Sequence, residues 1–259
     1  ATPENMNAKD SLKRTVLHFL ASGIAKMPDV ADKLLPFISL HATPENMNAK
    51  DYDDRTVLLF LARGISKKPE AADTIMPFIS QHATQENVNC KAHNEMRVLH
   101  CLAFGISQKP EVADKLLPFI SEHATPENMN AKDSLKRTVL HYLAWGIKIN
   151  ADAAEKLLPF ISLHATPENV NAKDCEDRTV LHILAWGIFE KPDAADKLLP
   201  FISLHATPEN VNIKDCNEST VLHYLAWGIS KKPDTADKLL PFISLHATPE
   251  NVNAKDCED

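Results

Sequence analysis

The stretch from Ala165 to His205, ATPENVNAKDCEDRTVLHILAWGIFEKPDAADKLLPFISLH, decides the fold, because the whole chain repeats it. Six copies of 41 residues follow one another without insertion or deletion, and part of a seventh copy ends the chain. The repeats cover residues 1–41, 42–82, 83–123, 124–164, 165–205 and 206–246, followed by the partial repeat 247–259. A fixed period of this size is typical of a solenoid, in which each repeat packs on its neighbours. We therefore expect one domain, residues 1–259, formed by a single repeat array.

Two helices and a turn are predicted within this stretch. Thr179 can cap a first helix that stops at Gly187, where we expect the left-handed backbone that glycine adopts readily. A second helix is predicted from Pro192, because proline suits a first helical turn, and Pro200 is expected to bend or split that helix. A capped turn beginning at Thr207 then leads into the next repeat. The predicted fold class is all-α, an elongated solenoid of stacked helical hairpins with short turn loops.

Positions that do not vary between repeats indicate the core. Val180, Leu181, Leu184 and Ile188 have identical equivalents in all six repeats. At the helical spacing of 100° per residue these positions form one apolar stripe. We expect this stripe to face the neighbouring helices.

The segments Val170-Asn171-Ala172-Lys173-Asp174 and Thr179-Val180-Leu181-His182, followed by Leu184-Ala185 and Gly187, resemble the ankyrin repeat. That family has a hairpin turn of this type, a T-P-L-H helix start, a first helix that ends near glycine and a leucine-rich second helix, and its usual period is about 33 residues. The resemblance implies a scaffold that binds other proteins. HEAT-like helix pairs, with a period of about 40 residues, are the competing architecture.

The chain departs from the ankyrin pattern at the tip of the hairpin turn, where the family has glycine. The residues at this position are Lys13, Asp54, Glu95, Lys136, Asp177 and Glu218. Because glycine alone adopts a left-handed backbone without a steric penalty, we expect hairpin tips of altered shape.

Two positions of the first helix vary and carry most of the aromatic residues. One ladder consists of Phe19, Phe60, Cys101, Tyr142, Ile183 and Tyr224, and the other of Ser22, Arg63, Phe104, Trp145, Trp186 and Trp227. We expect both ladders to lie opposite the core stripe, where the resemblance implies a concave groove for partners. Trp and Tyr are frequent interface hot spots. The predicted partner-binding residues are Phe19, Phe60, Phe104, Tyr142, Trp145, Trp186, Tyr224 and Trp227. The alternative is that these rings pack between neighbouring first helices and bind nothing.

The turn tips vary as well and form a second candidate surface, with plain solvated loops as the alternative. They comprise residues 11–14, 52–55, 93–96, 134–137, 175–178 and 217–219.

Other classes of function lack the residues they need. There is no glycine-rich phosphate loop and no nucleophile near a base, so we expect no enzyme and no cofactor. Histidines that recur singly do not converge on one ion, so we expect no metal site. A net charge of −7 argues against nucleic acid and anionic lipid, and no apolar run is long enough to cross a membrane.

The leading prediction is a protein-interaction scaffold that binds its partner through the aromatic groove and the turn tips. Two alternatives stay open: the recognition arm of a larger enzyme, toxin or host-directed effector, and a structural repeat element that self-assembles end to end. The five cysteines are interpreted as free thiols in a reducing compartment. The predicted location is therefore the cytoplasm, or the host cytosol if the chain is a secreted effector.

Overall fold

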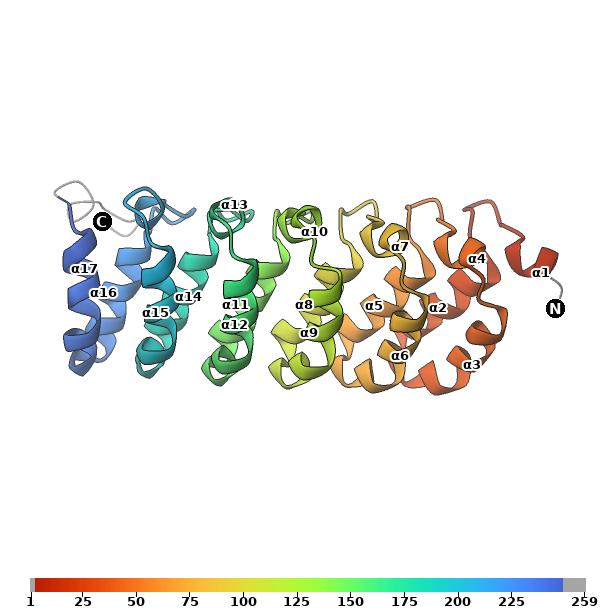
Figure 1. Ribbon diagram of the computed structural model, residues 1–259, viewed down its shortest axis with the longest axis horizontal. Helices are drawn as coiled ribbons and strands as arrows, with labels where there is room; N and C mark the ends of the chain where they lie inside the picture. Colours follow the sequence, from red (N-terminus) through yellow and green to blue (C-terminus); the bar gives the residue numbers. More distant parts are fainter. Residues whose placement is uncertain (1–2, 249–259) are drawn as a thin grey trace. The chain divides into compact units, whose positions relative to one another are not determined.

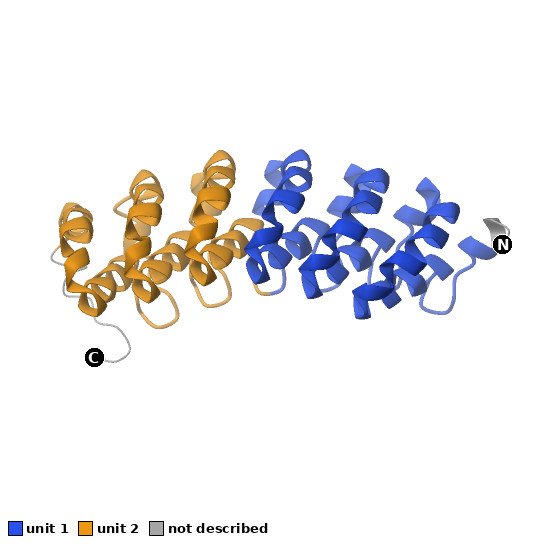
Figure 2. Ribbon diagram, turned by 90° about the horizontal axis from the view of Figure 1, so that it is seen from below, with its two compact units in different colours: residues 1–134 blue, residues 135–259 orange. Residues whose placement is uncertain are grey.

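The computed structural model describes residues 3–248 of the 259 residues, and this part of the chain forms helices and turns without a strand. The chain divides into two compact parts, residues 1–134 and 135–259, called here the N-terminal part and the C-terminal part (Figure 2). Most of the predicted partial repeat, residues 249–259, lies outside the described residues. The fold class is all-α, as predicted, whereas a single domain formed by all six repeats stays a prediction.

Each full repeat contains a first helix (helix A), a short 3-10 turn and a second helix (helix B), as labelled in Figure 1. Helices A are α2 (Val16–Lys26), α5 (Val57–Lys67), α8 (Val98–Gln108), α11 (Val139–Ile149), α14 (Val180–Glu190) and α16 (Val221–Lys231). Helices B are α3 (Ala31–His41), α6 (Ala72–His82), α9 (Ala113–Glu122), α12 (Ala154–His164), α15 (Ala195–His205) and α17 (Ala236–His246). The 3-10 turns between them are η1 (Pro28–Val30), η2 (Pro69–Ala71), η3 (Pro110–Val112), η4 (Ala151–Ala153), η5 (Pro192–Ala194) and η7 (Pro233–Thr235).

A short helical segment precedes each helix A, where the sequence predicts a capped turn. These segments are α1 (Pro3–Asn7), α4 (Pro44–Asn48), α7 (Gln85–Asn89), α10 (Pro126–Asn130), α13 (Pro167–Val170) and η6 (Asn210–Asn212). In α13 the cap is reciprocal, because the Thr166 hydroxyl accepts the backbone N–H of Asn169 and the Asn169 side chain accepts that of Thr166. The Asn169 amide also donates to the His164 carbonyl at 2.9 Å, which ties the segment to the end of α12.

Helix A continues past its glycine, so the predicted left-handed end at Gly187 is wrong. None of the six glycines has a positive φ, and α14 ends three residues further on. Lys191 then leaves the helical conformation (φ −132°, ψ 81°), which the following proline disfavours, and Pro192 begins η5. In the fourth repeat, which lacks this proline, the Asn150 side chain accepts the backbone N–H of Asp152 instead. The residues after the helix, rather than the glycine within it, end helix A.

The glycines instead leave room between neighbouring helices A. A Cβ atom on Gly64 would lie 3.4 Å from the carbonyl oxygen of Ile24 in α2. A Cβ atom on Gly187 would lie 3.3 Å from Cδ1 of Leu198 and 3.4 Å from Cα of Lys148 in α11. The missing side chain therefore brings this part of helix A into contact with the backbone of the preceding helix A.

Alanine substitutions are expected to separate these two roles of glycine. Gly23→Ala is expected to stabilise the chain by about 0.5–1 kcal/mol, because alanine favours the helix and only Leu34 Cδ1, at 3.6 Å, comes near the new Cβ. Gly187→Ala brings the same helix preference, but its Cβ would lie 3.3 Å from Leu198 Cδ1, which must shift, and 3.4 Å from Lys148 Cα, so we expect a smaller gain than in Gly23→Ala. Urea unfolding measures both variants, and equal stabilisation would contradict this interpretation of Gly187.

Helix B runs through its proline, so the predicted split at Pro200 is not seen. Pro200 lies inside α15 and is exposed. The carbonyl that loses its donor belongs to Asp196, which is exposed as well. Because water can reach this side of the helix, the missing backbone bond does not divide it.

The predicted core stripe is confirmed. Val180, Leu181, Leu184 and Ile188 are fully buried. Within each part, successive helices A contact one another, and so do successive helices B. Burying one large apolar side chain contributes about 1.5–3 kcal/mol, so these interfaces hold the repeats together.

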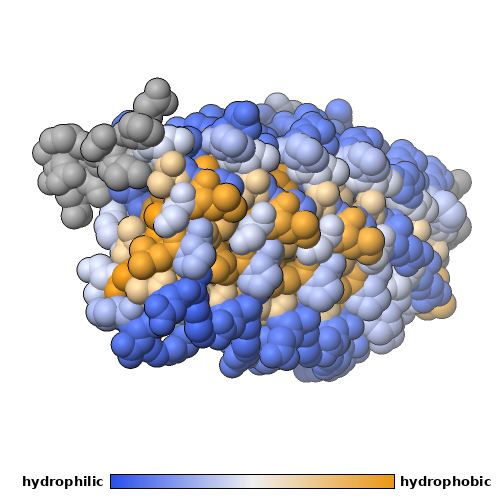
Figure 3. All heavy atoms as spheres, turned by 60° about the vertical axis from the view of Figure 1, so that its left-hand side comes forward, coloured by the Kyte–Doolittle hydropathy of each residue, from blue (hydrophilic) through white to orange (hydrophobic). Residues whose placement is uncertain are grey.

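Apolar side chains also remain outside the core. Figure 3 shows them recurring between polar residues on one face of the molecule. The most exposed large apolar residues of helices B are Leu40, Leu163, Leu204 and Leu245, between 73% and 78% exposed. None of the helices among residues 3–248 has the length and apolar character needed to cross a lipid bilayer.

Ion pairs on the surface join successive repeats at matching places. Lys68 pairs with Asp29 of the preceding repeat, and Lys109 pairs with Glu70, each across 39 residues of chain. Pairs as exposed as these contribute little to stability, so they indicate the register of neighbouring repeats rather than the strength of the interface.

Candidate partner-binding surface

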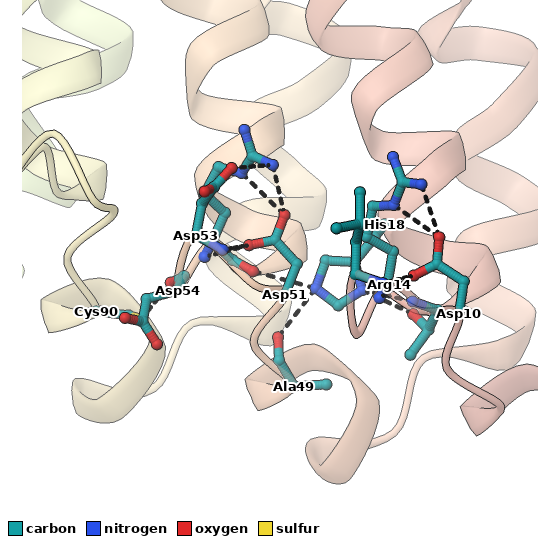
Figure 4. Close-up of polar contacts among 11 residues, drawn as sticks. Asp10, Arg14, His18, Ala49, Asp51, Asp53, Asp54 and Cys90 are labelled. Carbon is teal, nitrogen blue, oxygen red and sulfur yellow. Dashed lines mark hydrogen bonds and ion pairs between the residues drawn. The ribbon is translucent and has the colours of Figure 1, made fainter.

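An aspartate organises the turn before helix A, as Figure 4 shows for the first two repeats. Asp51 Oδ1 accepts the backbone N–H groups of Asp53 at 3.0 Å and Arg55 at 2.8 Å. Its Oδ2 lies 2.7 Å from the Arg55 guanidinium. Asp54, at the tip, has a φ of 59°, and its equivalents in the other repeats lie between 55° and 60°. The tips thus keep the left-handed backbone that glycine favours, and the altered shape expected at this residue is not seen.

Backbone hydrogen bonds connect each turn with the next within each part. In the N-terminal part the Tyr52 N–H donates to the Leu12 carbonyl at 2.9 Å. In the C-terminal part the Cys216 N–H donates to the Glu176 carbonyl, also at 2.9 Å. Within each part the turns therefore form one row joined by hydrogen bonds, next to the amino-terminal ends of helices A.

The histidine in the first turn of helix A, which is His18 in the first repeat and His182 in the fifth, links these turns to the core. His18 Nε2 lies 3.1 Å from the carbonyl oxygens of both Ala49 and Arg55, and carbonyls only accept, so Nε2 carries the proton. Nδ1 accepts the backbone N–H of Thr15 at 3.1 Å. Burial lowers the pKa of His18 even though both carbonyl bonds favour its charged form. This neutral histidine joins two repeats and has a structural role.

The first aromatic ladder does not point into open solvent, which corrects the expectation from the sequence. Phe60, Tyr142 and Tyr224 are only 4–7% exposed. Phe60 lies edge-on to His18 of the preceding repeat and beneath the Arg55 guanidinium, 4.9 Å from the ring centre. Packed helices are about 8–10 Å apart, so a ring on this side of helix A is covered by its neighbour. The rings of this ladder pack between neighbouring helices A, and only Phe19, with no helix A before it in the described chain, is exposed at 49%.

The second ladder is partly exposed and forms a row of tryptophans in the C-terminal part. We call Trp145, Trp186 and Trp227 the tryptophan row; each is half-buried, as is Phe104 in the N-terminal part. Trp145 and Trp186 meet edge to face, with ring centres 5.4 Å apart. Tyr224 stacks on Trp186 at 5.9 Å and meets Trp227 edge-on at 5.2 Å. The rings of the row are therefore linked by continuous contacts, through the buried Tyr224 between Trp186 and Trp227, and each indole keeps part of its surface exposed.

Cations lie over the indole rings of this row. Lys148 Nζ is 4.1 Å from the centre of the Trp186 ring, and the Arg178 guanidinium is 4.9 Å from that of Trp145. Such contacts contribute about 0.5–2 kcal/mol each and hold the rings in one orientation. Lys148 is itself held by Glu190 at 2.8 Å. The row is a rigid, amphipathic surface of rings and cations.

A buried ion pair fixes the arginine that covers the row. Arg178 lies 3.1 Å from Asp174 and 2.5 Å from Glu176 and is only 4% exposed. Burial opposes ionisation of Asp174, but backbone N–H groups and the Arg178 guanidinium outweigh it and lower the Asp174 pKa. The charged pair is therefore preorganised beside the indoles.

The sixth repeat replaces this arginine with Ser219, and a tyrosine takes over its role. The Tyr224 hydroxyl donates to Asp215 Oδ2 at 2.6 Å. Burial, together with this bond to a carboxylate, raises the pKa of Tyr224, so its hydroxyl stays protonated as a donor. Tyr224 thus stabilises the turn from below the surface.

Arg137 and Arg178 belong to the turn tips that the sequence predicts as a second candidate surface, but their position over the aromatic rings was not predicted. Lys148 and Phe189, from the late part of helix A, were missed; Lys148 lies over Trp186, and Phe189 packs on Trp227 at 5.7 Å. The sequence does contain a signal for Lys148 and Phe189, because the other repeats have serine or alanine at this position. No group of three His, Cys, Asp or Glu residues within residues 3–248 is placed to hold a metal ion.

Of three comparisons with known proteins, one bears on the fold. A scan against models of protein families finds no match, and a search of curated proteins finds none. Among solved structures, the crystal structure of an ankyrin repeat protein superposes with a TM-score of 0.56 at 14% sequence identity, over 86% of this chain and 96% of that protein. The chain has the ankyrin-repeat fold, so the HEAT-like alternative is set aside. This fold usually mediates protein–protein interaction and is typically not enzymatic.

Proposed function

We propose that this chain is a protein-binding scaffold whose docking surface in the C-terminal part is the tryptophan row together with the turns beside it. The observation that carries the proposal is the contact between Trp145 and Trp186, two adjacent indoles that stay half-exposed. Tryptophan is enriched among interface hot spots, and its removal there typically costs about 2–4 kcal/mol of binding.

The surroundings of the row support binding beyond a purely structural role. The indole Nε1 of Trp145 is buried without a hydrogen-bond partner. An unpaired buried donor lowers the stability of the fold, which is unusual for a residue selected for stability alone. Ring orientations are fixed by Lys148 and Arg178, so little conformational freedom is lost when a partner docks. The adjoining left-handed turn tips add exposed polar groups at the rim.

The proposed scaffold acts in a reducing compartment such as the cytoplasm. Cys175 and Cys216 are free thiols exposed on successive turns of the C-terminal part. Exposed thiols at the edge of a binding surface form mixed disulfides readily in an oxidising environment.

Replacing Trp186 with leucine is expected to weaken binding at least about 30-fold, because leucine fills part of the space but lacks the broad ring. Photocrosslinking from position 148 identifies the bound protein, and titration of that protein against the purified chain measures the affinity. All three tryptophans lie in this row, so intrinsic fluorescence reports docking directly.

The matched control is Leu204→Ala, which removes an exposed apolar side chain from helix B in the same part of the chain. Its affinity is expected to stay within about twofold of the parent. If Trp186→Leu binds with the affinity of the parent and Leu204→Ala loses affinity, the docking surface lies on helices B instead. Light scattering that rises with concentration in the absence of a partner would instead indicate end-to-end self-assembly.

A further inference from the structure

The same side of helices A has a different character in the N-terminal part, where it is hollow and basic. A cavity of about 490 Å³ lies along α2, α5 and α8. We call it the basic hollow; it is lined by Ser22, Ala25, Lys26, Arg55, Phe60, Arg63, Ser66, Lys67 and Phe104. Its charged residues are all cations.

Small or ring-free side chains border this hollow. Ser22, which is small, and Arg63, which has no ring, stand at the position that carries the tryptophan row in the C-terminal part. Ala25 and Ser66 stand where Lys148 and Phe189 fill space in that part. Phe104, which is half-buried, and Phe60, which is 7% exposed, supply the apolar floor of the hollow.

The cations of the hollow are poorly neutralised within the chain. Arg55 is paired with Asp51 and Asp53, both at 2.7 Å. Among residues 3–248, no carboxylate forms an ion pair with Lys26, Arg63 or Lys67. Lys67 Nζ instead donates to the backbone carbonyl of Lys26 at 2.6 Å.

Placing Arg63 and Lys67 four residues apart on α5 puts like charges side by side, which weakens a helix slightly. The whole chain has a net charge of −7, so a cluster of unpaired cations is not a consequence of a basic composition. A group of cations around an apolar floor is complementary to a ligand that carries both carboxylates and apolar side chains.

We propose that the basic hollow binds an acidic segment of a partner protein in an extended conformation. Carboxylates of the segment pair with Arg63 and Lys67, and an apolar side chain of the segment rests on Phe104, which is half-buried. The planar guanidinium of Arg63 matches a carboxylate with two parallel hydrogen bonds. This inference concerns the N-terminal part only and does not depend on binding by the tryptophan row.

A protein segment fits the hollow better than a nucleic acid does. Nucleic acids are held by many phosphate contacts along a basic track, whereas the hollow offers a few cations within an acidic chain. Single strands are also bound by stacking on exposed rings, and Phe60 is only 7% exposed.

The test uses the full chain and a fluorescein-labelled peptide of alternating Glu and Phe, followed by fluorescence anisotropy. The peptide is expected to bind the parent and to lose affinity as salt is added. The variant Arg63→Gln plus Lys67→Gln is expected to bind at least about tenfold more weakly. The control variant Lys9→Gln plus Lys33→Gln changes the net charge equally at exposed lysines outside the hollow, and is expected to stay within about twofold of the parent.

Several results would overturn the proposal. They are the absence of peptide binding to the parent, equal affinity for a peptide with Gln in place of Glu, and equal losses in the two double variants. Tighter binding of an oligothymidylate of the same length would assign the hollow to nucleic acid instead. All tryptophans lie in the C-terminal part, so a failure of the anisotropy test leaves the fluorescence test of the tryptophan row unaffected.

Discussion

A variant in which glycine replaces Lys13, Glu95, Lys136 and Glu218 is expected to be about 2–4 kcal/mol more stable to unfolding than the parent. Each of these residues has a φ between 55° and 60°. A side chain in this left-handed conformation costs about 1–2 kcal/mol, because its Cβ crowds the following carbonyl oxygen. Glycine avoids that clash but loses about 0.5–1 kcal/mol more backbone freedom on folding, which leaves a net gain at each site.

Single variants separate backbone strain from other effects. Lys136→Ala keeps the Cβ atom and is expected to give no gain, whereas Lys136→Gly is expected to give about 0.5–1 kcal/mol. Asp177→Gly is expected to give less, because aspartate tolerates the left-handed backbone. Glu95 and Glu218 also lose exposed ion pairs, which are worth little. Urea unfolding followed by circular dichroism measures all of these, and a gain in Lys136→Ala equal to that of glycine would refute the strain argument.

Lowering the pH from about 7.5 to about 5 is expected to remove several kcal/mol of stability. Burial lowers the pKa of seven histidines in the folded chain: His18, His82, His123, His164, His182, His205 and His246. Below the ordinary pKa of about 6.5, the unfolded chain takes up protons that the folded chain does not. Stability is therefore complete above this pH and falls as the pH decreases, by up to about 1.4 kcal/mol per pH unit for each fully buried histidine.

The histidines that close each repeat offer a specific test of this expectation. The Nε2 atoms of His82, His164 and His205 are buried without a hydrogen-bond partner, so a proton added there would have no acceptor. Each ring packs on the phenylalanine four residues before it, at 4.4–4.5 Å. Replacing all three with leucine keeps an apolar contact and removes the titration.

The triple variant is expected to match the parent near pH 7.5 and to be clearly more stable near pH 5. Urea midpoints measured across this range for both proteins decide the matter. Parallel pH profiles for parent and variant would show that other groups control the acid sensitivity.

The period and the apolar stripe were sufficient to predict the helices, because both follow from spacing along the chain. The role of Gly187 could not be predicted from the sequence, because glycine serves equally to relieve a left-handed backbone and to make room for a neighbour. The φ of this glycine, which is not positive, and the 3.4 Å approach of its Cβ position to Lys148 in α11 distinguish these roles. The actual left-handed residues, such as Asp177, are held by the Asp174 carboxylate, which accepts the backbone N–H groups of Glu176 and Arg178.

The sequence placed both aromatic ladders on one side of helix A but did not predict how far each ladder is buried. A helical wheel places Tyr142 and Trp145 on the same side of helix A. It cannot show that neighbouring packing covers the tyrosine, which is 4% exposed, and leaves the indole half-exposed. Arg178 reaches this surface from the turn of the following repeat, and such a contact is invisible to periodicity within one helix.

The equal spacing of the ion pairs limits how the chain can change its length. Lys68 with Asp29, and Lys232 with Asp193, are each separated by 39 residues, at the same place in different repeats. Excising or duplicating one complete repeat would keep this 39-residue spacing at the new junction. Removing a single residue would put one interface out of phase with its neighbours. A gene for such a chain can therefore grow or shrink by unequal recombination in whole modules, while small deletions are poorly tolerated.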